Sequence, residues 1–323
     1  MIKFILKKIA YGFLVMFGVI TLVFVLFNIL PGDPARMMLG QRADEQSIEA
    51  IHKELGLDKP LHHQYCKYIY DLSHFDLRRS YQSGKPVVDI LKEAFPNTIY
   101  LALLSIAIAF VLGVTLGSLA AVFKDGWLEK IILVITSLGM SLPSFFAAIL
   151  IAWVFAFLLA DYTGLSMFGS LYSVDDFGEG EYLSLKNIIL PAITLGIRPL
   201  AVITELTKST MKEVLSQDYI RTAKAKGLSK FKIIYSHALR NTLNPIVSSI
   251  SGWFASLIAG AVFVEYIFDW KGVGVVIVDS LEKYDFPVVM GSLLYISIIC
   301  IFCFIIHIIL YSTYNVKLNI IRF

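Results

Sequence analysis

The chain has 323 residues, of which 57% are hydrophobic and only 16% charged, and its mean hydropathy is +0.72. Soluble globular domains carry about a quarter of charged residues, so this composition excludes two soluble domains of the usual kind. It indicates a membrane protein, and no nucleic-acid partner is expected despite the net charge of +3.

Six apolar runs are long enough to cross about 30 Å of hydrocarbon as helices. They cover residues 9–30, 98–123, 131–159, 187–208, 246–268 and 287–311. The first run is too long for the apolar part of a signal peptide, and Asn28-Ile29-Leu30-Pro31 offers no small-x-small cleavage site. The sequence therefore predicts an all-α, multi-pass membrane protein with six spans, and residues 98–311 form its five-span core.

Residues 31–97 between the first two spans are polar enough to lie outside the membrane. The first span stops at Pro31-Gly32-Asp33-Pro34, because proline and glycine break helices. Within 45–72, apolar residues recur at helical spacing with interruptions at Gly56 and Pro60. This pattern predicts two short amphipathic helices on the outer face.

The distribution of lysine and arginine predicts the orientation. The N-terminal tip 1–8 has three lysines and no acids, and the C-terminal tip 312–323 has Lys317 and Arg322. Segment 205–241 has eight basic and three acidic residues, whereas 31–97, 160–186 and 267–286 are more acidic than basic. Since basic loops stay in the cytoplasm, both termini and the loop 209–245 are predicted to be cytoplasmic.

Prolines and charges inside the third and fourth spans mark a candidate translocation path. Pro143 and Pro191 lie within apolar runs, where a proline can kink a helix. Arg198 lies near mid-span, and Glu205 lies two turns further on the same face. A buried arginine in a membrane needs a polar cavity or a partner. The alternative for the prolines is helix packing alone.

The densest positive charge lies in "DYIRTAKAKGLSKFK", residues 218–232. Asp218 suits an N-cap and Gly227 a C′ position, which predicts a short helix over 219–226. Ser229 would cap a second helix over 230–242, and Asn244-Pro245 would begin the fifth span. Small residues on the short helix would let a partner's backbone approach. The alternative is a loop that rests on anionic lipid headgroups.

Several stretches together resemble the permeases of the dipeptide/oligopeptide/nickel ABC importer family. They are "ILPGDPA" (29–35), "ELGLDKPLHHQY" (54–65), "SLPSFF" (141–146), "ILPAITLG" (189–196), "LTKSTMKEVL" (206–215), "QDYIRTAKAKGLSKFKIIYSHALRNTLNPI" (217–246) and "GAVFVEYIFDWKGVGVVIVDSLEKYDFPVVMG" (260–291). The resemblance covers nearly the whole chain in the same order. It implies a type I importer fold with an external segment after the first helix.

The resemblance also implies roles for particular residues and for partners. The helix that docks on an ATPase subunit would be formed by Asp218, Tyr219, Arg221, Ala223, Ala225, Gly227 and Leu228. Two ATP-binding cassette subunits would bind ATP and magnesium, a homologous permease would complete the path, and an external solute-binding protein would deliver cargo. The chain would lie in the bacterial inner membrane and would itself bind no nucleotide, because it lacks a G-x-x-x-x-G-K-[ST] motif. No other cofactor and no metal are expected in it.

Three departures from the family pattern concern the cavity and the outer face. Glu205 stands where a basic or neutral residue is expected, and "FDLRRS" (75–80) replaces a glycine-bearing turn. The segment 161–184 is longer and more acidic than expected.

Two other classes of protein fit the sequence less well. An ion-coupled secondary carrier usually shows repeated halves and acids at mid-depth, and neither is seen. An intramembrane protease is disfavoured because no H-E-x-x-H or G-x-S-x-G occurs. Peptides are the commonest cargo of the family, and nickel chelates or oligosaccharides remain open.

Overall fold

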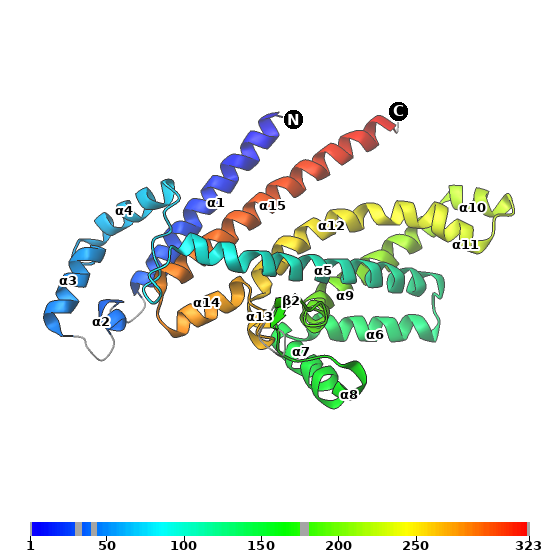
Figure 1. Ribbon diagram of the computed structural model, residues 1–323. Coiled ribbons are helices and arrows are strands. Elements are labelled where there is room, and N and C mark those ends of the chain that lie inside the picture. Colours follow the sequence, from blue (N-terminus) through cyan, green and yellow to red (C-terminus); the bar gives the residue numbers. More distant parts are fainter. Residues whose placement is uncertain (1, 30–33, 40–43, 175–180, 322–323) are drawn as a thin grey trace. The chain divides into compact units, whose positions relative to one another are not determined.

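The computed structural model describes residues 2–29, 34–39, 44–174 and 181–321, which are almost entirely helical (Figure 1). The chain divides into two compact units. The first comprises Met1–Thr98 with Lys271–Ile305, and the second comprises Ile99–Trp270 with Ile306–Phe323. The predicted all-α fold class is confirmed, with one small pair of strands in addition.

The candidate spans within the described residues are of two kinds. Four single helices are long and apolar enough to cross a membrane: α1 (Ile2–Ile29), α5 (Val87–Val122), α9 (Ile189–Leu215) and α15 (Phe286–Ile321). Two bent pairs could each form one further span, namely Trp127–Ser141 with Ser144–Leu158 and Lys230–Val247 with Gly252–Gly260. Each of the six predicted apolar runs therefore overlaps one candidate span.

The third span is broken, although the sequence was read as one run over 131–159. Helix α6 (Trp127–Ser141) ends before Leu142, and α7 (Ser144–Ile151) begins after Pro143, whose ψ of 140° is extended rather than helical. The two segments of this span meet at 115°. Proline restricts the residue before it to extended conformations, which explains why the helix ends there.

The first unit contains the segment that is predicted to be external. Its further helices are α2 (Pro34–Leu39), α3 (Glu45–Leu55), α4 (Leu61–Ser73) and α14 (Val273–Glu282). The side chain of Asp44 caps α3 by accepting a hydrogen bond from the amide of Ser47 at 2.6 Å, and α3 ends at Gly56 with a φ of +72°. The two amphipathic helices predicted over 45–72 are thus confirmed, whereas α14 was not predicted.

Close contacts along α1 hold the first unit together. A Cβ on Gly12 would lie 3.2 Å from Ile301, so the two helices α1 and α15 approach closely at that glycine. Nearer the other end of α1, Phe24 packs with Tyr68 of α4 and Leu294 of α15 in a buried cluster. These contacts place α4 against both helices.

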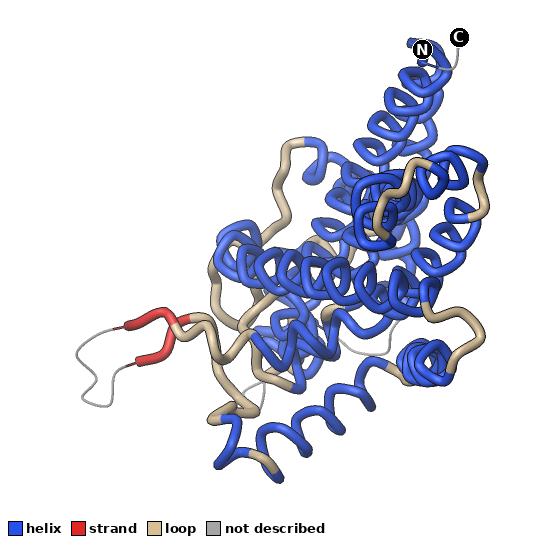
Figure 2. Tube along the Cα trace, turned by 90° about the vertical axis from the view of Figure 1, so that its right-hand side faces the viewer, coloured by secondary structure: helices blue, strands red, loops and turns tan. Residues whose placement is uncertain are grey.

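The second unit holds the remaining elements. They are α6, α7, the π-helical turn η2 (Ala152–Leu158), α8 (Ala160–Thr163), β1 (Tyr172–Val174), β2 (Glu181–Leu183), α9, α10 (Asp218–Ala225), α11 (Lys230–Lys232), the π-helical turn η3 (Ile233–Ala238), α12 (Leu239–Gly260) and α13 (Val262–Ile267). Figure 2 draws the antiparallel strands in red; Tyr172 lies opposite Leu183. This hairpin, in the acidic segment 161–184, was not predicted.

Helix α9 packs on the second-unit part of α5 through small residues. Cβ atoms added to Gly113 or Gly117 of α5 would collide with Ile203 or with the carbonyl oxygen of Thr204 on α9. On α9, a Cβ at Gly196 would lie 2.9 Å from the carbonyl oxygen of Ser105. Gly113 and Gly117 form a G-x-x-x-G pair, the pattern that lets membrane helices approach backbone to backbone. Helix α9 is therefore held at a fixed position against α5.

Candidate functional site

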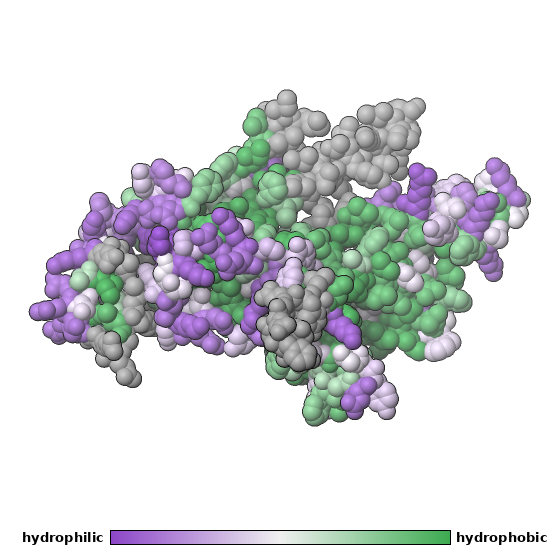
Figure 3. Space-filling model, in the orientation of Figure 1, coloured by the Kyte–Doolittle hydropathy of each residue, from purple (hydrophilic) through white to green (hydrophobic). Residues whose placement is uncertain are grey.

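The basic segment 218–232 lies beyond the apolar parts of α6, α9 and α12, at the end where α10 and α11 are labelled in Figure 1. In Figure 3 its surface is largely hydrophilic, whereas the adjoining surfaces of the second unit are mostly hydrophobic. Helix α10 spans Asp218–Ala225 and follows α9 after only two residues. The segment forms a protrusion, here called the basic knob (residues 218–232).

The start of α10 differs from the prediction. Gln217, with extended backbone angles, is the N-cap residue, and Asp218 is the first helical residue rather than the cap. A carboxylate in the first turn still interacts favourably with the helix dipole. Asp218 also pairs with Arg221 one turn on, at 3.4 Å, and both side chains are highly exposed.

The turn after α10 has the predicted geometry. Gly227 adopts a φ of +76°, in the left-handed region that favours glycine. Its space is open, since no heavy atom would lie within 4 Å of an added Cβ. Ser229 then caps the next helix by accepting a hydrogen bond from the amide of Lys232. The predicted helix–glycine–helix arrangement of the basic knob is thus present.

The helix after the turn is longer than predicted. Residues 230–260 run continuously through α11, η3 and α12, so Asn244-Pro245 does not begin a new helix. Pro245 lies inside α12. The predicted boundary at 242–245 was wrong because the helix extends well beyond the apolar run.

A buried cluster fixes the basic knob to the rest of the second unit. Ile220 and Ala223 of α10 are buried together with Met211 of α9 and Ile233 and Ala238 of η3. Leu228 packs against the same cluster. Ala223 was predicted to leave space for a partner's backbone, but this alanine packs against its own chain. The space that its small side chain leaves is used within the permease.

Two polar contacts reinforce the base of the basic knob. The side-chain amide of Asn241 on α12 donates to the hydroxyl of Tyr219 at 2.8 Å. Lys208 on α9 pairs with Glu129 on α6 at 2.5 Å, and both side chains are largely buried. Sequence reasoning did not find Glu129 or Asn241, because nothing in the local pattern links residues so far apart in the chain.

The docking residues implied by the resemblance are therefore of two kinds. Ile220, which the resemblance did not include, lies buried with Ala223, and Leu228 is partly buried. The other five are exposed: Asp218, Tyr219, Arg221, Ala225 and Gly227. The basic knob is thus packed against its own chain on one face and has a mainly positive exposed surface.

The four candidate path residues lie in the second unit but are not all alike. Pro191 is buried in the first turn of α9, where a missing N–H leaves no helical hydrogen bond unmade. Pro143 forms the break in the third span. Arg198 and Glu205 are exposed on α9, and neither makes an ion pair or hydrogen bond with any residue that the structure describes. The two are therefore not paired with each other.

Arg198 lines a cavity of about 80 Å³. Its walls come from α6, α7, α9 and α12, so the break at Leu142-Pro143 directly shapes the space. Glu205 does not line this cavity. The structure thus brings Arg198 to the break near Pro143 and leaves Glu205 elsewhere on α9.

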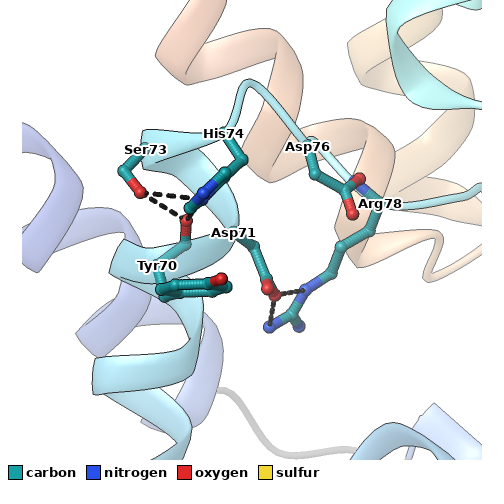
Figure 4. Close-up of polar contacts among 6 residues, drawn as sticks. All are labelled: Tyr70, Asp71, Ser73, His74, Asp76 and Arg78. Atoms are coloured by element: carbon teal, nitrogen blue, oxygen red, sulfur yellow. Dashed lines mark hydrogen bonds and ion pairs between the residues drawn. The ribbon is translucent and has the colours of Figure 1, made fainter.

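The first unit has a polar cluster of its own in the segment that departs from the family pattern (Figure 4). Phe75 and Arg78 adopt left-handed conformations, with φ of 59° and 66°, which glycine would adopt more readily. Asp71 accepts from the guanidinium of Arg78 at 3.2 Å, and the side chain of Asp76 accepts from the amide of Arg78 at 2.8 Å. These contacts hold the turn "FDLRRS" without glycine.

Asp285, between α14 and α15, fixes the adjoining loop. Its carboxylate accepts hydrogen bonds from the hydroxyl of Ser80 at 2.5 Å and from the amide of Tyr81 at 2.9 Å. Burial raises the pKa of Tyr81 above its usual value. The hydrogen bonds from Ser80 and Tyr81 to Asp285 join residues about two hundred positions apart, and no sequence signal predicted them.

The fold and these features define a polytopic helical membrane protein in which a basic knob, packed on a buried cluster, follows α9 after two residues. Residues 113–317 match the family described as binding-protein-dependent transport system inner membrane component, and residues 1–102 match the N-terminal part of such membrane components. The chain belongs to this family of inner-membrane permeases and is the permease subunit of an importer. The resemblance stated from the sequence motifs is thereby confirmed.

Relatives agree with this assignment, and a solved structure shares the fold. The chain is 35% identical to the glutathione transport system permease protein GsiC of Escherichia coli O6:H1 over 98% of both chains. It is 38% identical to a putative peptide transport system permease protein of Brucella abortus over 92% of both chains. Its fold resembles that of the MetNI methionine ABC transporter, with a TM-score of 0.55 and 15% identity over 70% of this chain and 96% of that one.

Proposed function

We propose that this permease forms half of the translocation path of an ATP-driven peptide importer in the bacterial inner membrane. The relatives named above are permeases for glutathione and for peptides, which supports a peptide-like cargo. A homologous permease completes the path, and an external solute-binding protein delivers the cargo. ATP and magnesium are bound by two partner ATPase subunits.

The observation that carries this proposal is the anchored basic knob. Its exposed residues Asp218, Tyr219, Arg221, Ala225 and Gly227 form the surface that docks on an ATPase subunit, while Ala223 and Leu228 hold that surface in place. Because α10 follows α9 after two residues, movement of the docked ATPase is transmitted directly to α9. The Lys208–Glu129 pair extends this coupling to α6.

The same proposal assigns the orientation. The basic knob and both termini lie in the cytoplasm, and residues 31–97 with the segment 161–184 lie outside. Membrane lipids surround the apolar helices, and the external segments contact the solute-binding protein. Pro143, Pro191, Arg198 and Glu205 shape or line the path, with Pro143 acting through the break in the third span.

The test is reconstitution of the complex in proteoliposomes. The tagged permease is purified with its partner permease, the ATPases and the solute-binding protein. We expect peptide uptake that requires ATP and the loaded binding protein and that persists when a protonophore collapses the proton gradient. Uptake that needs an ion gradient and no ATPase subunit would instead establish the ion-coupled carrier.

A further inference from the structure

The cavity at the break in the third span has a lining of unusual chemistry for a membrane protein. Its polar side chains are Ser144 of α7, Thr194 and Arg198 of α9, and Trp253 and Ser256 of α12, and no carboxylate lines it. Its volume is about 80 Å³, well above the roughly 10–15 Å³ that one water molecule needs on the same measure. The space therefore has room for a small polar group such as a carboxylate.

Arg198 is the charge in this cavity that lacks compensation. It is the tenth residue of the 27-residue helix α9, and it makes no ion pair or hydrogen bond with any described residue. Glu205 lies two turns away on the same helix, and Glu129 is bound to Lys208. Because a lone guanidinium at membrane depth is unfavourable, an anion that enters the cavity would gain from it.

The remaining lining suits a carboxylate that carries an apolar carbon chain. A guanidinium presents parallel N–H groups that match a carboxylate with two hydrogen bonds. The Trp253 indole N–H and the hydroxyls of Ser144 and Ser256 are further donors, whereas the Thr194 hydroxyl already donates to the carbonyl of Leu190 at 2.8 Å. Apolar residues complete the wall and would contact the carbon atoms beside the carboxylate.

We propose that this cavity binds the terminal carboxylate of the transported solute, so that Arg198 selects cargo with a free carboxyl end. This inference rests on the proposed function as an import permease and adds the chemical class that the path prefers. The alternative role for Arg198 is that it pairs with an acidic residue on the partner permease and never contacts cargo.

The first experiment measures the electrostatics of the cavity without transport. Cys66, Cys300 and Cys303 are replaced by alanine, and Ser256→Cys is introduced in the assembled complex. The measured quantity is the rate of reaction with an anionic sulfonatoethyl thiosulfonate divided by the rate with its cationic trimethylammonium analogue. This ratio should be about tenfold higher with Arg198 present than after the further change Arg198→Gln. The matched control Arg240→Gln removes an exposed arginine that does not line the cavity and should leave the ratio unchanged. An equal ratio in all variants overturns the proposal.

The second experiment asks whether cargo uses the site. Trialanine should slow the reaction of the Ser256→Cys complex, and trialanine amide should not. Arg198→Gln should lower ATP-driven trialanine uptake by about tenfold or more with the complex intact, and Arg240→Gln should not. Loss of the partner permease from the Arg198→Gln complex, or unchanged uptake, overturns the proposal. If the unaltered complex imports no peptide, the proposed function fails instead, while the thiol ratio still reports on the anion site.

Discussion

Replacement of Gly227 tests how the basic knob presents its docking surface. At a φ of +76° with open space around it, an added side chain meets no neighbouring atom, so the cost is the backbone conformation alone. That cost is about 1–2 kcal/mol for an ordinary residue. The free variant can relax out of this conformation, and ATPase binding must then restore it. Because 1–2 kcal/mol is a factor of about 5–30 in an equilibrium, Gly227→Val should weaken ATPase binding by up to about that factor.

Asparagine provides the matched control, because it adopts the left-handed region more readily than other residues with side chains. Gly227→Asn should therefore bind the ATPase within about threefold of the unaltered permease. The assay is titration of immobilised permease with purified ATPase subunit, with size-exclusion chromatography to confirm that each variant is folded. If valine binds as well as glycine, the turn does not position the docking surface. If asparagine is as harmful as valine, the partner contacts Gly227 itself and the conformational argument fails.

Four further predictions concern packing, pH and orientation. Gly117→Leu should destabilise the complex by about 1–3 kcal/mol and lower its Tm, because the new side chain would collide with Thr204. The control Gly18→Leu should not lower the Tm, because the space at Gly18 is open. Equal Tm values for the two variants would contradict the α5–α9 packing. Because the pKa of Tyr81 is raised in the folded state, its contribution to stability is complete below the ordinary pKa of 10.0 and is lost as pH rises above it. Tyr81→Phe should remove this loss of stability at alkaline pH, measured as Tm in a pH series of thermal unfolding. An unchanged pH profile would refute the prediction. A cysteine at Ser173 should react with an impermeant thiol reagent from outside the cell and one at Ser229 should not; the reverse pattern would invert the topology. In the isolated permease, Ala223→Leu should lower the stability by about 1–3 kcal/mol, because it overpacks the buried cluster. Ala225→Leu should leave that stability unchanged and weaken only ATPase binding. Equal effects of the two variants on stability would show that Ala223 is not a packing residue.

Elements whose start and stop signals are local could be predicted from the sequence. Gly56 and Pro60 separated α3 from α4, and Gly227 with Ser229 defined the turn of the basic knob. Glycine, proline and capping residues act within a few positions of the chain. Their effects can therefore be inferred without tertiary contacts.

Contacts between distant residues could not be predicted in this way. The Glu129–Lys208 pair joins two helices, and Asp285 binds the loop at Ser80 and Tyr81. Either acid could equally be a solvated surface charge, since acids are common in the loops. Only the fold brings these groups together.

The turn at 75–80 shows how residues other than glycine can be held in left-handed conformations. The resemblance placed a glycine-bearing turn there, and Phe75 and Arg78 still adopt left-handed conformations. A non-glycine residue in that region is strained and persists where its surroundings compensate. Here Asp71 accepts a hydrogen bond from the guanidinium of Arg78 and Asp76 accepts one from its backbone amide, so one side-chain contact and one backbone contact offset the strain at Arg78.

Ala223 illustrates the opposite limit of sequence reasoning. A small residue on a basic helix predicts a close approach by some neighbour, but it does not say which neighbour. The structure places Met211 and Ile233 of the same chain around it. A partner that docks on α10 must therefore use its other face, where Arg221 and Ala225 are exposed. The small side chain of Ala223 lets α10 pack into the buried cluster with Met211 of α9, and on the proposed function this packing is what would carry movement of a docked ATPase to α9.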